Sequence, residues 1–246
     1  YMRVDRVWRA IQAAALAIAV IVGGTAFSAA ADSRQTAPGH LDSYVMALSW
    51  SPSYCAASAE RQPKRAPDQQ CAGRPFAFVV HGLWPQYERG FPSYCQVPAP
   101  RLDHTTVGGA LDLMPSPRLV FHEWERHGTC TGLLPHAFFE TVRKARAVVK
   151  IPDEYLALDK PVTVTAAEIA DAFLKANPTL ARDDLAVACD RKRLTEVRVC
   201  LTREFGFRAC PEVTQRACRL DKMLMPAMRG GPAAPKSAPK SEPAAG

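Results

Sequence analysis

Eight cysteines restrict the fold of this 246-residue chain more than any other feature of its sequence. All of them lie between residues 55 and 218, and no two are spaced as a C-x-x-C pair, which argues against a zinc ribbon. An even number of cysteines in an exported chain indicates disulfide bonds, because the compartments outside the cytoplasm are oxidising. Eight cysteines can pair in roughly a hundred ways, so the residues alone leave the connectivity open.

The start of the chain indicates that it is exported. Three arginines precede an apolar run over residues 10–27, and alanines at 29–31 offer the small residues that a signal peptidase recognises. We therefore expect residues 1–31 to be a signal peptide cleaved before Asp32, and the protein to be secreted or periplasmic. The apolar run is also long enough to span a bilayer, so an uncleaved membrane anchor is the alternative. Once the signal is removed, no stable membrane association is expected.

Net charge gives only weak support for a polyanionic partner. The sequence carries +7, of which residues 1–31 contribute +2 and residues 229–246 another +2, so that +3 remains for residues 32–228. Residues 229–246 consist mainly of proline, alanine, serine, glycine and lysine, a composition that predicts a disordered tail. Residues 32–228 are long enough for one domain with its own core, and they show no internal repeat.

The densest group of chemically active side chains is the stretch FHEWERHGTC at residues 121–130. Ser116 is a favourable N-cap residue, Pro117 fits the first helical position, and Gly128 is typical of the position just after a helix end. These signals predict one short helix over residues 117–127.

Four polar side chains share one face of this helix at about 100° per residue: His122, Glu123, Arg126 and His127. The face fits three interpretations: a solvated surface, a zinc site, or acid–base catalysis beside an anion. The zinc-binding helix of metalloproteases carries its histidines four residues apart, whereas these two are five apart, so we expect no metal here. Histidine exchanges protons near neutral pH, and Arg126 offers a cation for an anionic substrate.

A second stretch, FAFVVHGLWP at residues 76–85, has the alternating apolar pattern of a buried strand. His81 follows the apolar run, and Trp84 lies just beyond it. Taken singly, a histidine at a strand end is as often a hydrogen-bonded structural residue as a functional one. A single tryptophan is more often part of the core than of a binding site.

Together, FVVHGLWP and HEWERHGTC resemble the two active-site segments of the ribonuclease T2 family. Shorter similarities, ALSWSPSYC and FPSYC, extend the resemblance over residues 42–220. The resemblance implies a central, mostly antiparallel sheet with helices packed on one side. The sequence itself also favours the α+β class, because its predicted strands and helices segregate instead of alternating strictly.

The resemblance assigns catalytic roles to three histidines. His81 matches the general acid that protonates the leaving 5′-oxygen, and His127 matches the general base that deprotonates the 2′-hydroxyl. His122 matches the histidine that holds the phosphate. RNA carries its own nucleophile, so such an enzyme needs no cofactor and no metal-bound water. The expected first product is a 2′,3′-cyclic phosphate, which the family can hydrolyse to a 3′-phosphate.

Other residues match the family's remaining substrate contacts. Glu123 matches the carboxylate that helps to stabilise the pentacoordinate phosphorane, and Trp84 matches an aromatic residue that stacks on a base. Arg126 stands where many members have lysine, although a guanidinium also neutralises a phosphoryl oxygen. The loop at 86–100 adds three aromatic residues that either stack on bases or pack the loop onto the body: Tyr87, Phe91 and Tyr94.

The resemblance also implies a disulfide connectivity. Its most consequential bond would tie the loop after the His81 strand to the end of the catalytic helix. The expected set is Cys95–Cys130, Cys189–Cys218, Cys200–Cys210 and, from the two cysteines that remain, Cys55–Cys71.

Local signals predict further elements. Three segments alternate as strands: 43–50, 185–189 and 196–202. Residues 51–74 are polar and contain prolines, which predicts a loop. A helix with an apolar stripe is expected over residues 135–149. Thr165 and Glu168 form a capping box that starts another helix, which we expect to end near Ala176.

The sequence thus predicts a secreted or periplasmic endoribonuclease that acts as a monomer on single-stranded RNA. DNA lacks the 2′-hydroxyl nucleophile and should not be cleaved. The alternative is a disulfide-linked binding protein that keeps the fold and has lost catalysis, although every catalytic position is filled here. Cleavage of RNA by the pure protein separates these two functions.

Overall fold

The computed structural model describes residues 37–228. The expected signal peptide (1–31) and the expected tail (229–246) lie outside these residues, so both stay predictions. Within the described part of the chain, no helix combines the length and the apolarity that crossing a membrane requires.

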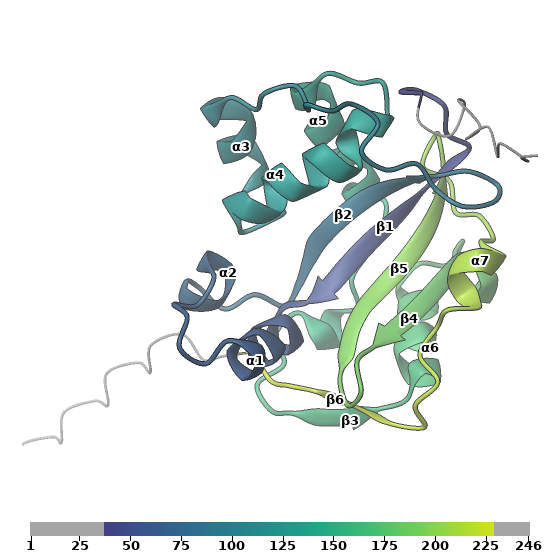
Figure 1. The fold of residues 1–246 in the computed structure, drawn as a ribbon. Helices are drawn as coiled ribbons and strands as arrows, with labels where there is room; N and C mark the ends of the chain where they lie inside the picture. The colour runs from purple at the N-terminus through teal and green to yellow at the C-terminus, as the bar shows by residue number, and fades with distance from the viewer. Residues whose placement is uncertain (1–36, 229–246) are drawn as a thin grey trace, which may run out of the picture. The chain divides into compact units, whose positions relative to one another are not determined.

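A four-stranded antiparallel sheet forms the centre of the fold (Figure 1). Its strands are β1 (Ser43–Trp50), β2 (Phe78–Gln86), β4 (Leu185–Cys189) and β5 (Leu194–Thr202), and they lie in the order β2-β1-β5-β4. Each neighbouring pair runs antiparallel. The predicted antiparallel sheet and the α+β class are therefore confirmed.

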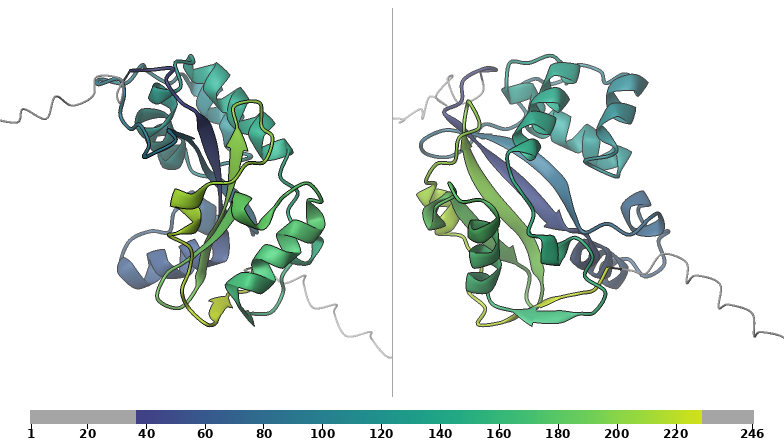
Figure 2. Two further views of the ribbon diagram at one scale, coloured as in Figure 1. Left: turned by 90° about the vertical axis from the view of Figure 1, so that its right-hand side faces the viewer. Right: turned by 180° about the vertical axis from the view of Figure 1, so that it is seen from behind.

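Helices lie on both sides of this sheet (Figure 2), whereas the family resemblance implied helices on one side only. The α-helices among the described residues are α1 (Ser51–Arg61), α2 (Gln69–Ala72), α3 (His104–Ala110), α4 (Pro117–Arg126), α5 (Pro135–Ala147), α6 (Ala166–Ala176) and α7 (Pro211–Thr214). The left view of Figure 2 shows α5 and α6 on one side of the sheet, and α1 and α7 on the other. A small second sheet pairs β3 (Val162–Val164) with β6 (Met223–Met225). Strands of three residues are too short to give a recognisable sequence pattern.

The main core lies between one face of the sheet and the helices α4, α5 and α6. Strand β1 contributes its even-numbered side chains to this core, from Tyr44 to Trp50, and β5 contributes Val197, Val199 and Leu201. Because side chains alternate along a strand, the odd-numbered positions of β1 and the even-numbered positions of β5 face the other way. That second face carries the candidate site.

A β-bulge interrupts the pairing of β2 with β1. Val80 pairs with Leu48 and Gly82 pairs with Ala47, so His81 is an additional residue that opposes none. Bulges of this kind bend a strand locally and redirect a side chain, and they are common beside active sites.

The bulge decides how His81 and Trp84 point. The core receives Val80 before the bulge and Leu83 after it, so the core-facing positions of β2 change from even to odd. His81 and Trp84 therefore share the face away from the core, where their ring centroids lie 5.3 Å apart. Strict alternation would put residues at this spacing on opposite faces of the sheet.

The predicted loop over residues 51–74 is wrong, because it contains α1 and α2. Pro52 lies in the first turn of α1, where a missing N–H breaks no helical hydrogen bond. The helix buries residues of its first turn and Cys55 and leaves most of the others accessible, so it lacks the apolar period by which helices are recognised. The Cys55–Cys71 disulfide joins α1 to α2.

Helix α4 is the predicted catalytic helix, with differences at both ends. It ends at Arg126, and His127 is the C-cap residue that leads into the 3-10 turn Gly128–Cys130. Ser116 precedes the helix, but its hydroxyl does not cap it. That hydroxyl instead donates a hydrogen bond of 3.1 Å to Asp68 Oδ2, next to α2.

Other predicted elements differ from the structure by a few residues at their ends. Helix α5 ends at Ala147 rather than at 149, and β5 begins at Leu194 rather than at 196. The capping box is confirmed, because Thr165 Oγ1 accepts from the Glu168 N–H and the Glu168 carboxylate accepts from the Thr165 N–H.

The disulfide connectivity implied by the family resemblance is confirmed. The structure contains Cys55–Cys71, Cys95–Cys130, Cys189–Cys218 and Cys200–Cys210. The second of these bonds joins the loop after β2 to the 3-10 turn after α4, so it links the two segments that carry the predicted catalytic residues.

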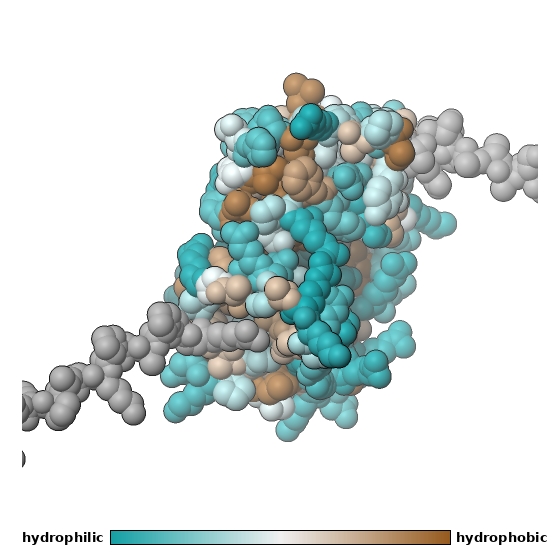
Figure 3. All heavy atoms as spheres, turned by 60° about the vertical axis from the view of Figure 1, so that its left-hand side comes forward, coloured by the Kyte–Doolittle hydropathy of each residue, from teal (hydrophilic) through white to brown (hydrophobic). Residues whose placement is uncertain are grey.

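The face that carries α1 to α4 is mostly hydrophilic (Figure 3). Apolar residues gather toward the top of this view, at the height at which Figure 1 shows α3 to α5. Leu134, just before α5, is one of the most exposed large apolar residues of the described chain, with 78% of its surface accessible. Neither it nor the exposed Phe121 lines the cleft described next.

Candidate active site

A cleft of about 320 Å³ lies on the face of the sheet away from the core. Residues of β2, α4, β5 and α7 line it. It contains every residue predicted to be catalytic, together with the predicted base-stacking tryptophan: His81, Trp84, His122, Glu123, Arg126 and His127. A wider groove of about 1150 Å³ between α1 and α4 shares His81 and His122 with the cleft.

His81 lies between two carboxylates. Its Nδ1 is 2.5 Å from Glu196 Oε1, and its Nε2 is 3.7 Å from Glu123 Oε1. About a third of the side chain (33%) is accessible to solvent. Burial lowers the pKa of His81, but the hydrogen bond to Glu196 and the charges of both carboxylates outweigh it, and the net shift is upward. The imidazole therefore holds its proton more strongly than a free histidine.

Glu123 is buried beneath the cleft floor, with 1% of its surface accessible. Its Oε2 accepts a 3.0 Å hydrogen bond from the indole Nε1 of Trp84. Gly82 leaves the space for this carboxylate, because a Cβ at that position would lie 1.9 Å from Glu123 Oε2. Burial raises the pKa of Glu123 to about 7, against the charge of His81 and the indole hydrogen bond, which both lower it.

His127 is almost fully buried and lies against Trp84. The two rings are stacked, with centroids 5.6 Å apart and planes inclined by 29°. Burial and the charge of Arg126 lower the pKa of His127 to about 3, so its imidazole is neutral at physiological pH. Its Nδ1 has no hydrogen-bond partner among the described residues.

His122 and Arg126 occupy the more open wall of the cleft. Burial and the charge of Arg126 lower the pKa of His122. The guanidinium carbon of Arg126 lies 5.8 Å from the ring centroid of Tyr94, and its Nε has no hydrogen-bond partner among residues 37–228. Arg126 therefore brings a cation to the wall of the cleft.

A sequence profile of the ribonuclease T2 family matches residues 41–210 of the chain.

The chain belongs to the ribonuclease T2 family.

Two bacterial relatives support this assignment. A ribonuclease of Aeromonas hydrophila is 46% identical over 120 residues, which are 49% of this chain and 51% of that protein. Ribonuclease I of Escherichia coli (strain K12) is 24% identical over 206 residues, which are 68% of this chain and 75% of that protein. With the first two curated relatives, the alignment spans about half to three fifths of the relative's own length.

Solved structures share the fold of this T2 family member. The RNase-related protein from Calystegia sepium has a TM-score of 0.61 and 18% identity, and the match covers 77% of this chain and 99% of that one. RNase NT in complex with 5′-AMP has a TM-score of 0.54 and 22% identity, and the match covers 70% and 91% of the two chains. At these identities the likeness shows the fold alone.

The three aromatic residues predicted in the loop after β2 have different positions in this T2 family fold. Phe91 lines the cleft and is 45% exposed, so its ring is accessible to a ligand. Tyr94 contacts Arg126 instead, and its N–H donates a 2.9 Å hydrogen bond to the Arg126 carbonyl. Tyr87 does not line the cleft.

Two charged residues of β5 belong to the site and were not predicted from the sequence. Glu196 is buried and bonds His81, and Arg198 lines the cleft and pairs with Glu196. The pattern LTEVRVCLT carries a signal for them, because an acidic and a basic residue lie two apart within an apolar strand. Residues two apart on a strand share one face of the sheet. The sequence does not show which strands lie beside β5, and so it does not show which side chains these two residues contact.

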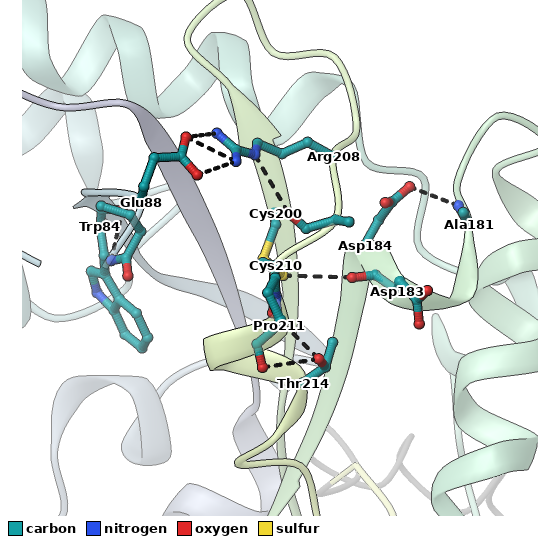
Figure 4. Close-up of a disulfide and its surroundings, with 12 residues drawn as sticks. Trp84, Glu88, Ala181, Asp183, Asp184, Cys200, Arg208, Cys210, Pro211 and Thr214 are labelled. Atoms are coloured by element: carbon teal, nitrogen blue, oxygen red, sulfur yellow. Dashed lines mark hydrogen bonds and ion pairs between the residues drawn. A yellow bond between two sulfur atoms is a disulfide. The ribbon is translucent and has the colours of Figure 1, made fainter. Parts of the chain in front are cut away.

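The wall of the cleft opposite α4 comes from α7 and from Arg216 just beyond its end, and neither was predicted from the sequence. Glu212 and Arg216 line the cleft there, and Glu212 Oε2 accepts a 2.9 Å hydrogen bond from Gly90 N–H. Figure 4 shows the Cys200–Cys210 disulfide beside α7. It also shows Arg208 reaching Glu88, with which it forms an ion pair of 3.0 Å. These bonds fix the loop that carries Phe91 beside α7.

Within residues 37–228, no three histidine, cysteine, aspartate or glutamate side chains are arranged to hold a metal ion.

Proposed function

We propose that this T2 family member is an endoribonuclease that cleaves single-stranded RNA by transphosphorylation, without a metal ion. One observation carries the proposal: a single cleft holds two histidines whose pKa values are shifted in opposite directions, and both rings lie against Trp84. His81, beside two carboxylates, favours its protonated form, whereas the buried His127 favours its neutral form. Such a pair supplies the acid and the base that the reaction needs.

In the first step, neutral His127 removes the proton of the 2′-hydroxyl, and the 2′-oxygen attacks the adjacent phosphorus. The bond from phosphorus to the 5′-oxygen then breaks, and His81 gives its Nε2 proton to that oxygen. The products are a 2′,3′-cyclic phosphate and a free 5′-hydroxyl. The negative charge of the bound phosphodiester offsets the charge of Arg126, which makes His127 a stronger base than it is in the free protein.

In the second step the two histidines exchange roles. His81, now neutral, removes a proton from water, which attacks the cyclic phosphate. His127, now protonated, returns its proton to the 2′-oxygen as that bond to phosphorus breaks. The product is a 3′-phosphate, and both histidines regain their starting protonation states.

Three further residues act on the phosphate. His122 and Arg126 bind its oxygens on the open side of the cleft. Glu123, with a pKa near 7, is partly protonated at neutral pH. An ionised carboxylate would repel the phosphorane, so we assign stabilisation to the protonated form, which donates a hydrogen bond to a phosphorane oxygen.

The shape of the site suits an unpaired strand. The cleft contains Trp84 and Phe91, on which a base can stack, and the wider groove beside α1 offers room for the nucleotide on the other side of the phosphate. We further propose that the catalytic domain is residues 32–228, that it works as a monomer outside the cytoplasm, and that it neither cleaves DNA nor stays on a membrane.

The test is the identity of the product. The purified protein, with an excess of chelator, is incubated with defined dinucleotides and homopolymers, and the phosphorus products are followed by ³¹P NMR. We expect a 2′,3′-cyclic phosphate that converts to a 3′-phosphate, and no cleavage of the matching DNA.

Products with 5′-phosphate ends and no cyclic intermediate would show that water attacks first, and that the roles given to His81 and His127 are wrong. No cleavage of any RNA by the folded protein would support the alternative of a binding protein on the same fold.

A further inference from the structure

Strand β5 places two charged side chains on the face of the sheet that carries the cleft. Its core-facing positions hold valine and leucine, whereas Glu196 and Arg198 lie between them on the other face. Glu196 pairs across the ladder with Ser49 of β1, and Arg198 pairs with Ala47. Strand β1 therefore separates these residues from His81, which lies on β2.

Small side chains on β1 allow contact across it. Neighbouring strands lie roughly 4.8 Å apart, so β2 and β5 are about 10 Å apart. At the level of His81, β1 presents only the methyl group of Ala47 and the hydroxymethyl group of Ser49 to this face. The bulge turns His81 toward the same face, and its Nδ1 reaches Glu196 Oε1 at 2.5 Å.

Both oxygens of the buried Glu196 carboxylate have partners. Oε1 accepts from His81 Nδ1 and, at 3.4 Å, from the hydroxyl of Ser49. Oε2 accepts from Arg198 Nε at 2.9 Å. The guanidinium of Arg198 lies in turn 5.3 Å from the ring centroid of Trp84.

We propose that Glu196, held in place by Arg198, is a positioning residue that orients His81 as the general acid. This inference rests on the proposed function and extends it to a residue outside the two family segments. An ionised carboxylate only accepts hydrogen bonds, so it fixes the proton of His81 on Nδ1 and leaves Nε2 to face the cleft.

Proton transfer then involves one nitrogen only. When the 5′-oxygen leaves, the Nε2 proton moves to it, while the Nδ1 proton stays on His81. Burial raises the pKa of Glu196, but the bond to His81 and the charge of Arg198 outweigh it and lower the pKa to about 2. Glu196 therefore stays ionised throughout the cycle and steadies the imidazolium before each transfer.

Other charged or titratable groups also face His81, and a test must leave them unchanged. Arg198 approaches from β5, Glu123 and His122 approach from α4, and His127 approaches from the residue after α4. Replacing Glu196 with the isosteric glutamine removes one negative charge and leaves these groups in place.

The experiment compares two leaving groups. One substrate is a natural dinucleotide, whose 5′-alkoxide needs a proton to leave. The other is a nucleoside 3′-(4-nitrophenyl) phosphate, whose phenolate leaves without one. For Glu196→Gln we expect kcat on the dinucleotide to fall by about 10- to 100-fold, a loss like that seen when the group that orients a metal-ligating histidine is removed. We expect kcat on the nitrophenyl ester, and KM for both substrates, to change less than about threefold.

Three variants calibrate this pattern. His81→Ala should show the same selective loss on the dinucleotide, and His127→Ala should lose activity on both substrates. Glu60→Gln is the matched control, because Glu60 is an ion-paired carboxylate that lines neither the cleft nor the groove. It should leave both rates unchanged.

A second measurement does not depend on turnover. Nitrogen-15 NMR of the wild-type protein should show His81 protonated on Nδ1, and in Glu196→Gln the titration of His81 should move to lower pH. Equal losses on both substrates, or a titration of His81 that stays in place, would overturn the positioning role. If the wild-type protein cleaves neither substrate, the proposed function fails. If the wild-type protein cleaves both substrates and Glu196→Gln slows both equally, only the role of Glu196 is rejected.

Discussion

Gly82 has less room for an added Cβ than any other glycine among the described residues. A Cβ there would lie 1.9 Å from Glu123 Oε2 and 2.4 Å from Trp84 Nε1, closer than any real contact. The hydrogen bond between these two groups, and with it the position of the carboxylate beneath the cleft, therefore requires a glycine.

The variant Gly82→Ala should displace the Glu123 carboxylate. We expect kcat to fall by about 100-fold and the free energy of unfolding to fall by about 1–3 kcal/mol, as for other overpacked sites. Dinucleotide cleavage and urea unfolding measure the two effects. Gly108→Ala is the control, because nothing lies within 4 Å of its added Cβ in α3. Normal activity of Gly82→Ala would show that Glu123 is not needed where it lies.

The two histidines predict the pH dependence of the reaction. The base must be neutral, and the pKa of His127 is lowered to about 3, so the rate limb that rises with pH should lie well below pH 6.5. The acid must be protonated, and the pKa of His81 is raised, so the falling limb should lie above about pH 6.5. Glu123 is coupled to His81 and contributes to the same limb. A kcat/KM for a dinucleotide that still rises between about pH 7 and 9 would contradict His81 as the acid.

At the scale of elements, the Cys95–Cys130 disulfide links the loop after β2 to the turn after α4. The same loop packs Tyr94 against Arg126, and the same turn begins at the residue after His127. The bond thus holds together the ends of the two segments that carry the proposed acid and the proposed base.

Replacing Cys95 and Cys130 together by alanine should lower the free energy of unfolding by about 2–5 kcal/mol. Activity should fall further than instability explains, because His127 loses its support. Cleavage rates are measured at a temperature at which the variant is fully folded by circular dichroism. The matched variant, in which Cys55 and Cys71 become alanine, should lose stability but retain more of its kcat. Equal kcat losses in the two variants would contradict a positioning role for the Cys95–Cys130 bond.

The sequence predicts those parts of the site that depend on local geometry. The shared face of α4 follows from helical periodicity, and the cleft contains all four of its polar side chains. The pairing of His81 with Glu196 could not be predicted, because it depends on the strand order β2-β1-β5 and on small side chains in the strand between them. Helix α1 was missed because residues 51–61 carry no apolar stripe.

At the scale of the whole molecule, the buried His127 links stability to pH. The unfolded chain binds a proton at this residue below about pH 6.5, whereas the folded protein binds it only near pH 3. Stability therefore falls as pH falls through this window, by up to about 1.4 kcal/mol per pH unit. Glu123 acts in the opposite sense, because its pKa is raised to about 7 and protonation below that value favours the folded state.

The variant His127→Gln removes one of these two opposing contributions. Between about pH 3.5 and 6, its free energy of unfolding should fall less steeply with acidification than that of the wild-type protein, by up to about 1.4 kcal/mol per pH unit. Urea unfolding at a series of pH values gives both slopes. Parallel slopes would mean that His127 titrates normally in the folded protein and is not desolvated.

The extra residue at His81 shifts the alternation of core-facing side chains along β2 by one position. Up to Val80 the even-numbered residues of β2 face the main core, and from Leu83 the odd-numbered residues face it. Deleting one residue between Val80 and Leu83 would restore strict alternation along the strand. Either the His81 side chain or the Trp84 side chain would then point into the core. The geometry of the cleft therefore depends on the length of this strand, and a relative that lacks the extra residue would keep the fold without this pair of neighbours.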